Sequence, residues 1–358
     1  MNSPELAMPK SFLAALFAVL ASPLVAQSPG FDCAKATTPV EKAICADHEL
    51  SKADADMSAA YRSWLDAAPP DQQEGIRQSQ RAWLHERLTQ CLSQDKTTVS
   101  SSCLLDTEKS RTKALSGMVE HHNGIAFVWR SIHLTAPDSP DVAKMMRDTS
   151  RPDSGYVDAS WPQAASNEPE WSAWNKAIAN AAGPSGQGER KAGTQWTKDD
   201  AVDSDTDVTV TLNSVSDSVI SASVFVETYG HGAAHPNHGA SQFNWMLKEQ
   251  RPLLGKDVFQ PQSDWGNELY DRINKYLHKA LDADGKSYEN WLNDPKGMQK
   301  TVHGIATDPN RWQIDDKGIT IVFIPYEVAC YACTPEDFTM SWESLKPLLN
   351  PAFTIPTR

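Results

Sequence analysis

The sequence Val219-Ile-Ser-Ala-Ser-Val-Phe-Val-Glu-Thr-Tyr229 alternates apolar side chains with small or polar ones. A period of two is typical of a β-strand with one buried face. The stretches 207–212 and 243–248 share the enrichment in β-branched or aromatic residues and predict partner strands. An antiparallel sheet is therefore predicted at the centre of the larger part of the chain.

Helical and strand-like patterns lie on both sides of this sheet in the sequence. Apolar residues recur at helical spacing over 265–281, and a second helix is predicted over 168–182, ended by Gly183-Pro184. The remaining predicted elements are strands at 125–134, 318–326 and 338–342, a helical turn at 345–349 and a loop at 183–200. The polar stretch 135–160 carries no predicted element. We predict a mixed α+β domain over residues 120–358.

Residues 31–117 carry the period of an α-helix instead. Helices are predicted over 47–67, from Pro69-Pro70-Asp71 to Cys91, and over 103–115, with Asp71 as the cap of the second. A core this small is usefully supplemented by disulfides. The predicted fold class is α+β: a small disulfide-bonded helical N-terminal domain, then a larger mixed domain with an antiparallel sheet.

The first residues have the pattern of an export signal. Lys10 precedes an apolar run that ends at Ala26, and Leu24-Val25-Ala26 is an acceptable cleavage site. No other stretch is apolar for long enough to cross a bilayer. We predict a signal peptide at residues 1–26 and a periplasmic or secreted mature protein without a membrane span.

Export changes the interpretation of the cysteines. The chain contains Cys33, Cys45, Cys91, Cys103, Cys330 and Cys333. An even set in an oxidising compartment favours disulfides, two in the helical domain and one local bridge near the end. If the first two helices are antiparallel, Cys45 lies near Cys91, which leaves Cys33 for Cys103; three pairings nevertheless remain open.

Cys330-Tyr-Ala-Cys333 also matches the spacing of a redox motif. Such motifs place their first cysteine at a helix N-terminus, where the dipole lowers the thiol pKa. Here the motif follows a strand and precedes Thr334-Pro335, with no helical pattern behind it. A structural bridge is therefore favoured.

The charge balance excludes some partners and favours others. With 33 basic and 46 acidic side chains the formal charge is −13, which argues against a nucleic-acid-binding surface. Residues 118–358 carry 32 acidic and 21 basic side chains, a net −11, whereas residues 31–117 carry 13 and 11. Such a surface attracts cationic partners.

The helical domain resembles the N-terminal domain of the LprI-like lysozyme inhibitors. The motifs that carry this resemblance are Phe31-Asp-Cys33-Ala-Lys-Ala, Val40-Glu-Lys-Ala-Ile-Cys45, Leu50-x3-Asp54-x6-Tyr61, Gln80-x2-Trp83-Leu84-x2-Arg87-x3-Cys91 and Cys103-x7-Arg111-x3-Leu115. They span about a quarter of the chain and include all four of its N-terminal cysteines. The resemblance implies an exported, disulfide-bonded helical module linked to the binding of lysozyme.

The second domain resembles the C-terminal domain of RsiV-type proteins. The motifs are Tyr229-Gly-His-Gly-Ala-Ala-His235-Pro-Asn, Leu254-Gly-Lys-Asp257-Val-Phe259 and Val322-Phe-Ile-Pro-Tyr326-Glu327-Val-Ala, within about residues 205–349. RsiV-type proteins sense lysozyme through this exported domain. This chain lacks their transmembrane helix and sigma-binding segment, so the resemblance implies ligand binding without signal transduction.

A histidine-rich segment is the first candidate site. Its residues are His231, Gly232, His235, Asn237 and His238, bracketed by glycines and by predicted strands. Three interpretations are open: a metal site, a turn in which His235 satisfies backbone groups, or a loop that contacts a partner. Because the segment contains no Asp or Glu, a metal is disfavoured, and the loop is the best candidate to enter a partner's cleft.

Polar residues on the helical stripes are the second candidate. Asp54 and Arg87 interrupt apolar faces, so we predict a structural ion pair between Asp54 and Arg87 or Arg111. The Trp83/Arg87 end of the helical domain is the other predicted partner contact. Most of the 12 Trp residues are expected in cores or interfaces, although they could also stack on carbohydrate.

Catalytic motifs are absent from the sequence. There is no Gly-x-Ser-x-Gly elbow, His-Glu-x-x-His motif or phosphate loop, and no cofactor or metal is predicted. The chain is therefore predicted to bind and sterically inhibit lysozyme or another basic cell-wall-degrading protein. A cell-envelope glycan-binding or scaffold protein and an unrecognised envelope hydrolase are the alternatives.

Overall fold

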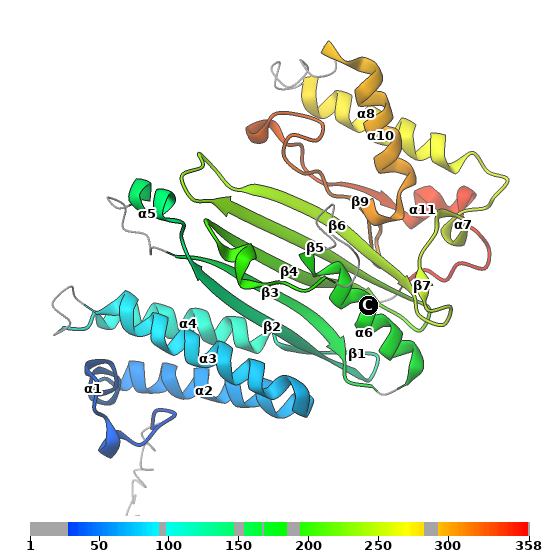
Figure 1. Cartoon of the computed structure of the whole chain (residues 1–358). Coiled ribbons are helices and arrows are strands. Elements are labelled where there is room, and N and C mark those ends of the chain that lie inside the picture. Colours follow the sequence, from blue (N-terminus) through cyan, green and yellow to red (C-terminus); the bar gives the residue numbers. More distant parts are fainter. Residues whose placement is uncertain are drawn as a thin grey trace, which may run out of the picture.

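The computed structural model describes residues 28–92, 98–146, 154–166, 168–184, 194–282 and 293–356. The predicted signal peptide, residues 1–26, lies outside these ranges. Within them, no helix is both long and apolar enough to cross a membrane. A helical module, a large sheet and a C-terminal group of helices follow one another across the molecule (Figure 1).

The helical module contains one helix more than predicted. Its helices are α1 (Pro39–Ala46), α2 (His48–Ala67), α3 (Pro70–Cys91) and α4 (Ser101–Ser116). A capping box between Thr38 and Glu41 starts α1, and Asp47 caps α2. The predicted cap Asp71 is wrong: α3 starts at Pro70, whose ring suits the first helical position, and Pro69 takes the N-cap position.

The disulfides of this module join residues close in sequence. Cys33 pairs with Cys45 and Cys91 pairs with Cys103. Of the three open pairings, the one with Cys45–Cys91 and Cys33–Cys103 is therefore wrong. The reason is local: Cys33 begins a 3-10 turn that leads directly into α1, which carries Cys45. The local bridge between Cys330 and Cys333 is confirmed.

The central sheet has seven strands in sequence order. They are β1 (Val119–His122), β2 (Ile125–Pro137), β3 (Ser154–Ala164), β4 (Ser204–Val215), β5 (Val219–Gly230), β6 (Asn237–Met246) and β7 (Arg251–Pro252). Only β3 and β4 pair in parallel, and the other neighbours are antiparallel. The antiparallel character of the predicted sheet is thus confirmed, with one parallel exception.

Helix α6 (Pro169–Ala181) covers one face of this sheet. Trp171, Trp174 and Ile178 of the helix are buried against strand residues such as Val208 and Val224. A short helix, α5 (Pro140–Met146), follows β2. Half of the loop predicted over 183–200, residues 185–193, lies outside the described residues, and its end forms a 3-10 turn at Lys198–Ala201.

The C-terminal module, residues 255–349, has a core of its own. Its helices are α7 (Gly255–Val258), α8 (Trp265–Asp282), α10 (Pro295–Thr307) and α11 (Trp342–Leu345), and its strands are β8 (Trp312–Ile314), β9 (Gly318–Ile321) and β10 (Phe338–Ser341). The strand predicted over 318–326 ends at Ile321, because Pro325 and the positive φ of Tyr326, +66°, belong to a turn.

The helical module and the sheet share buried contacts. Trp64 of α2 is 1% exposed, and its indole Nε1 donates a hydrogen bond of 2.7 Å to the carbonyl of Trp129 in β2. Val128 packs in one cluster with Met57 and Leu115 of the module. The predicted boundary near residue 120 is therefore not a break in the apolar core.

Candidate functional site

One face of the sheet carries a row of ionisable side chains across five neighbouring strands. The strand register pairs His133 with Asp158, Asp158 with Asp207, Asp207 with Glu227, and Glu227 with His238. Residues paired in register point to the same face of a sheet. We call Asp158, Asp207 and Glu227 the acidic row; a histidine lies at each of its ends.

The acidic row lies on the face opposite to α6. Val208, Val210 and Val224 alternate with the acidic positions along β4 and β5 and pack on the tryptophans of α6. Side chains of successive strand residues point to opposite faces, so the carboxylates face away from that core. The side chains of Asp158 and Glu227 remain 49% and 41% exposed, which leaves them open to a partner.

Histidine and tyrosine side chains contact the carboxylates of the acidic row. Nδ1 of His133 lies 3.6 Å from Asp158 Oδ2, and Nδ1 of His238 lies 3.2 Å from Glu227 Oε2. The Tyr156 hydroxyl donates to Asp207 Oδ2 at 2.9 Å. Burial raises the pKa of Asp207; the tyrosine hydrogen bond opposes this, and the neighbouring carboxylates of Asp158 and Glu227 raise the pKa further. The row is therefore an electrostatically unfavourable arrangement that a cation would relieve.

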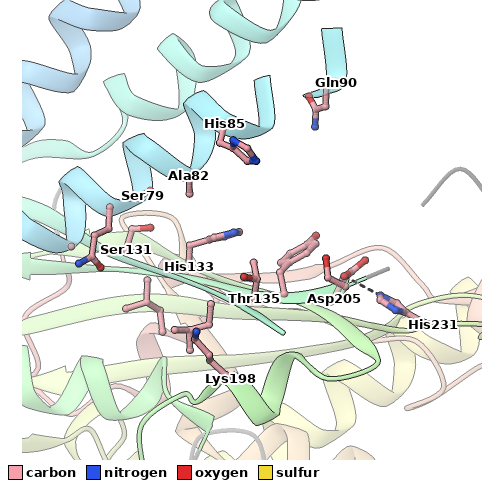
Figure 2. A pocket seen from close by; sticks show the side chains of 17 residues that line it. Ser79, Ala82, His85, Gln90, Ser131, His133, Thr135, Lys198, Asp205 and His231 are labelled. Atoms are coloured by element: carbon pink, nitrogen blue, oxygen red, sulfur yellow. Dashed lines mark hydrogen bonds and ion pairs between the residues drawn. The ribbon is translucent and has the colours of Figure 1, made fainter. Parts of the chain in front are cut away.

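A groove of about 930 Å³ lies beside the row, between α3 and the sheet. Figure 2 shows Ser79, Ala82 and His85 of α3 on one side of it and His133 and Thr135 of β2 on the other. Tyr156 of β3 and Asp205 of β4 also line it. The groove is thus bounded by the helical module on one side and by the sheet on the other.

His231 lies at one end of this groove, between two carboxylates. Its Nδ1 is 2.8 Å from Asp138 Oδ1 and its Nε2 is 3.1 Å from Asp205 Oδ1, and its side chain is only 3% exposed. Burial lowers the pKa of His231, but the hydrogen bonds to Asp205 and Asp138 outweigh this and raise it. The His231 ring ties the β5–β6 turn to the chain that precedes α5.

Aromatic rings cluster at the His238 end of the acidic row, near the turn between β5 and β6. We call Phe225, His235, His238, Tyr326 and Tyr331 the aromatic platform. The Tyr331 hydroxyl lies 2.8 Å from Nε2 of His238, and the Tyr326 hydroxyl lies 3.2 Å from Nε2 of His235. Ring centroids of His235 and Tyr331 are 4.6 Å apart, and Phe225 stacks on His238 at 5.7 Å. The C-terminal module thereby reaches the end of the acidic row.

The structure separates the residues of the predicted histidine loop. Gly232 takes the turn with φ +89°, which L side chains rarely adopt. Asn237 and His238 belong to β6, so the prediction of a loop is wrong from residue 237 onward. Within the described ranges, no group of three or more His, Cys, Asp or Glu side chains is arranged to hold a metal ion. Contact of this segment with a partner stays a prediction.

The other predicted site residues form the interior of the helical module. Arg87 Nη1 lies 3.4 Å from Asp54 Oδ1 and also contacts Glu108, a partner that the sequence analysis missed. Arg111, the alternative partner, donates instead to Gln80 Oε1. Both guanidinium groups lie over the ring of Trp83, at 5.1 Å for Arg87 and 5.5 Å for Arg111.

The acidic row was not predicted, although part of its signal is present in the sequence. Asp207 opens the predicted strand 207–212, and Asp205 precedes it by two residues, a spacing that puts both carboxylates on one face once the strand extends to Ser204. The third strand, β3, was missed because its open face carries Tyr156, Asp158 and Ser160, so the segment does not look apolar. Without that strand the convergence of Asp158 and Asp207 is not visible.

Comparisons with protein families assign two regions of the chain. The family described as "Lysozyme inhibitor LprI" matches residues 33–115, and the family described as "Protein of unknown function (DUF3298)" matches residues 256–343. The chain therefore contains an LprI domain and a DUF3298 domain. The second match is shorter than the resemblance to RsiV-type proteins over about 205–349, and residues 229–237 fall outside it.

Individual relatives add little about function. An uncharacterized protein of Rhizobium meliloti strain 1021 is 29% identical over 120 residues, which cover 28% of this chain and 86% of that protein. Among solved structures, a DUF3298 family member from Bacteroides fragilis has a TM-score of 0.43 at 18% identity, covering 65% of this chain and 96% of that one. One from Pseudomonas aeruginosa PAO1 has a TM-score of 0.39 at 12% identity, covering 63% and 94%.

Proposed function

We propose that this chain is an exported protein that binds lysozyme and blocks it sterically. The observation that carries the proposal is the LprI domain at residues 33–115, whose four cysteines are closed into two disulfides. Disulfides are typical of proteins that work outside the cytosol, as an inhibitor of a cell-wall-degrading enzyme must.

Electrostatics support the same partner. Residues 118–358 carry a net charge of −11, and lysozymes of animal type are strongly basic. Opposite charges accelerate encounter and favour the bound orientation, and the effect fades with added salt. The inhibitor performs no chemistry in this mechanism; it holds the enzyme while part of its surface covers the glycan cleft.

Two surfaces are candidates for covering that cleft. The turn between β5 and β6 projects His235 beside the aromatic platform. The second is the Trp83 end of α3, where Arg87 itself is 7% exposed and committed to Asp54 and Glu108. The turn is the stronger candidate, because Arg87 cannot contact a partner without giving up its buried carboxylates.

A turbidity assay tests the proposal. Purified mature protein is mixed with lysozymes of different classes, and the lysis of a bacterial cell suspension is followed at low and at high salt. We expect lysis by at least one basic lysozyme to slow, and more so at low salt. Undiminished lysis by every class at micromolar excess of the protein would refute the inhibitor function.

A glycan-binding protein is the second candidate. The exposed ring of Tyr326, next to the rings of His235 and Tyr331, is a surface on which a sugar could stack. Sedimentation of the protein with purified peptidoglycan, in the absence of lysozyme, would favour this function. The acidic charge of the sheet face favours a cationic protein over an anionic cell-wall polymer.

A further inference from the structure

We propose that the aromatic platform and the adjoining Glu227 form a binding surface for arginine or lysine side chains of a basic protein. The inference deepens the proposed function, on which it rests for the choice of partner, by assigning where and by what chemistry the partner is held.

The platform includes large aromatic rings that are exposed to solvent and do not belong to the buried core. Tyr326 is 60% exposed and Phe225 is 42% exposed, two of the few large apolar side chains that the described residues leave at the surface. Phe225 stacks on His238, the His238 ring lies 5.7 Å from that of Tyr331, and the Tyr331 ring lies 5.7 Å from that of Tyr326. Phe225 and Tyr326 are therefore the exposed members of one group of aromatic contacts, in which His235, His238 and Tyr331 are partly buried.

The protein fixes these rings in place. The disulfide between Cys330 and Cys333 closes a 3-10 turn around Tyr331, and the hydroxyls of Tyr331 and Tyr326 reach His238 and His235. The two tyrosines come from the C-terminal module, Phe225 and His238 come from the sheet, and His235 lies in the turn between β5 and β6. Rings held at both ends lose little conformational freedom when a ligand binds.

Charge decides which ligand fits. His238 contacts Glu227 at 3.2 Å, so the carboxylate lies directly beside the rings. The register continues from Glu227 to Asp207 and Asp158, which makes the neighbouring strands negative as well. A ring face attracts a cation, and a carboxylate beside it can receive the hydrogen bonds of a guanidinium. An apolar ligand would leave these carboxylates desolvated, whereas a cationic side chain complements them.

The experiment uses the full mature chain and two ligands, a basic animal-type lysozyme and an oligoarginine peptide. Glu227→Gln removes one charge without changing shape, and Asp217→Asn is the matched control, since Asp217 is exposed at the opposite end of the β4–β5 hairpin. Tyr326→Leu removes the ring, whereas Tyr326→Phe keeps it and removes only the hydroxyl that reaches His235.

Calorimetric titration at low salt is the measurement. We expect Glu227→Gln to weaken binding of both ligands about tenfold and Asp217→Asn to leave it unchanged. Tyr326→Leu should weaken binding about fivefold, and Tyr326→Phe should weaken it less, because the ring remains while the hydroxyl that holds it to His235 is lost. Circular dichroism of each variant establishes that the fold is intact.

The outcomes separate this surface from the proposed function. Suppose that the wild-type chain binds lysozyme and that the variants Glu227→Gln and Tyr326→Leu bind it equally well. The assignment of this binding surface is then refuted, and the proposed function stands. If oligoarginine binding falls in these variants but no lysozyme binds, the surface stands and the function is wrong. Binding of a neutral chitin oligosaccharide with no binding of oligoarginine would overturn the cationic ligand.

Discussion

Arg87 holds two carboxylates in the interior of the helical module. Asp54 and Glu108 both contact its guanidinium, and Glu108 is fully buried. Gly30 also donates its backbone N–H to Asp54 Oδ2 at 2.7 Å, whereas Glu108 Oε2 and Arg87 Nε have no hydrogen-bond partner within the described residues. One cation between two acids leaves an excess negative charge in a dry environment.

That imbalance predicts a pH dependence of stability. Burial raises the pKa of Glu108 from 4.5 to about 7, opposed by Arg87 and assisted by Asp54. The folded state therefore binds the proton more tightly than the unfolded state. The contribution of this proton to the free energy of unfolding is fully present below pH 4.5. It is lost as the pH rises through 7, by about 3 kcal/mol in total.

Denaturant unfolding of the wild type and of Glu108→Gln between pH 4.5 and 8 measures this effect. The free energy of unfolding of the wild type should fall over this range, and that of Glu108→Gln should fall less, since its amide does not titrate. Parallel curves for the two proteins would show that Glu108 is not the responsible group.

At the scale of elements, the sequence determines the regular ones best. The strand at Val219–Gly230 and the helices at His48–Ala67 and Trp265–Asp282 match their periodic patterns within a few residues. Each of these segments buries a single face. In that case the spacing of the apolar residues indicates whether the segment is a helix or a strand. The strand β3 was not predicted, because the face that lines the groove is polar and the segment therefore lacks the apolar pattern of a strand.

Two other features were missed, one for a local reason and one for a non-local reason. The apolar run 318–326 predicts a single strand, but the strand ends at Ile321. Pro325 and the left-handed backbone of Tyr326 belong to the turn that follows it. That turn creates the aromatic platform, so this part of the candidate site could not have been predicted from hydrophobicity. The acidic row depends on the parallel register of β3 and β4, which no local pattern encodes.

The short helix α1 depends on its disulfide. Cys33 and Cys45 are separated by 12 residues and tie the 3-10 turn to a helix of only 8 residues. Replacing both by serine should lower the free energy of unfolding by about 2–3 kcal/mol, through the greater entropy of the unfolded chain. Thermal unfolding of the double variant beside wild type tests this, and an unchanged midpoint would contradict it.

At the scale of the molecule, the helical module and the sheet are expected to unfold together. Trp64 donates to the carbonyl of Trp129, and Val128 packs among residues of the module. Trp64→Phe should lower the free energy of unfolding by about 1–2 kcal/mol and keep a single transition. Two separate transitions, followed by far-UV circular dichroism and tryptophan fluorescence, would show that the two parts are independent.

The acidic face lies where the two family-assigned regions approach the same sheet. The LprI domain supplies α3 along the groove, and the DUF3298 domain supplies Tyr331 at the end of the acidic row. A partner that lies across the row would touch both domains and the strands between them. This arrangement gives a reason for combining the two domains in one chain.

Calorimetric titration of the protein with a basic lysozyme at low and at high salt tests the central claim most directly. The account predicts a stoichiometric complex whose affinity falls as salt is added, because carboxylates of the sheet face meet cationic side chains. Absence of any complex at low ionic strength, with every class of lysozyme, would contradict it.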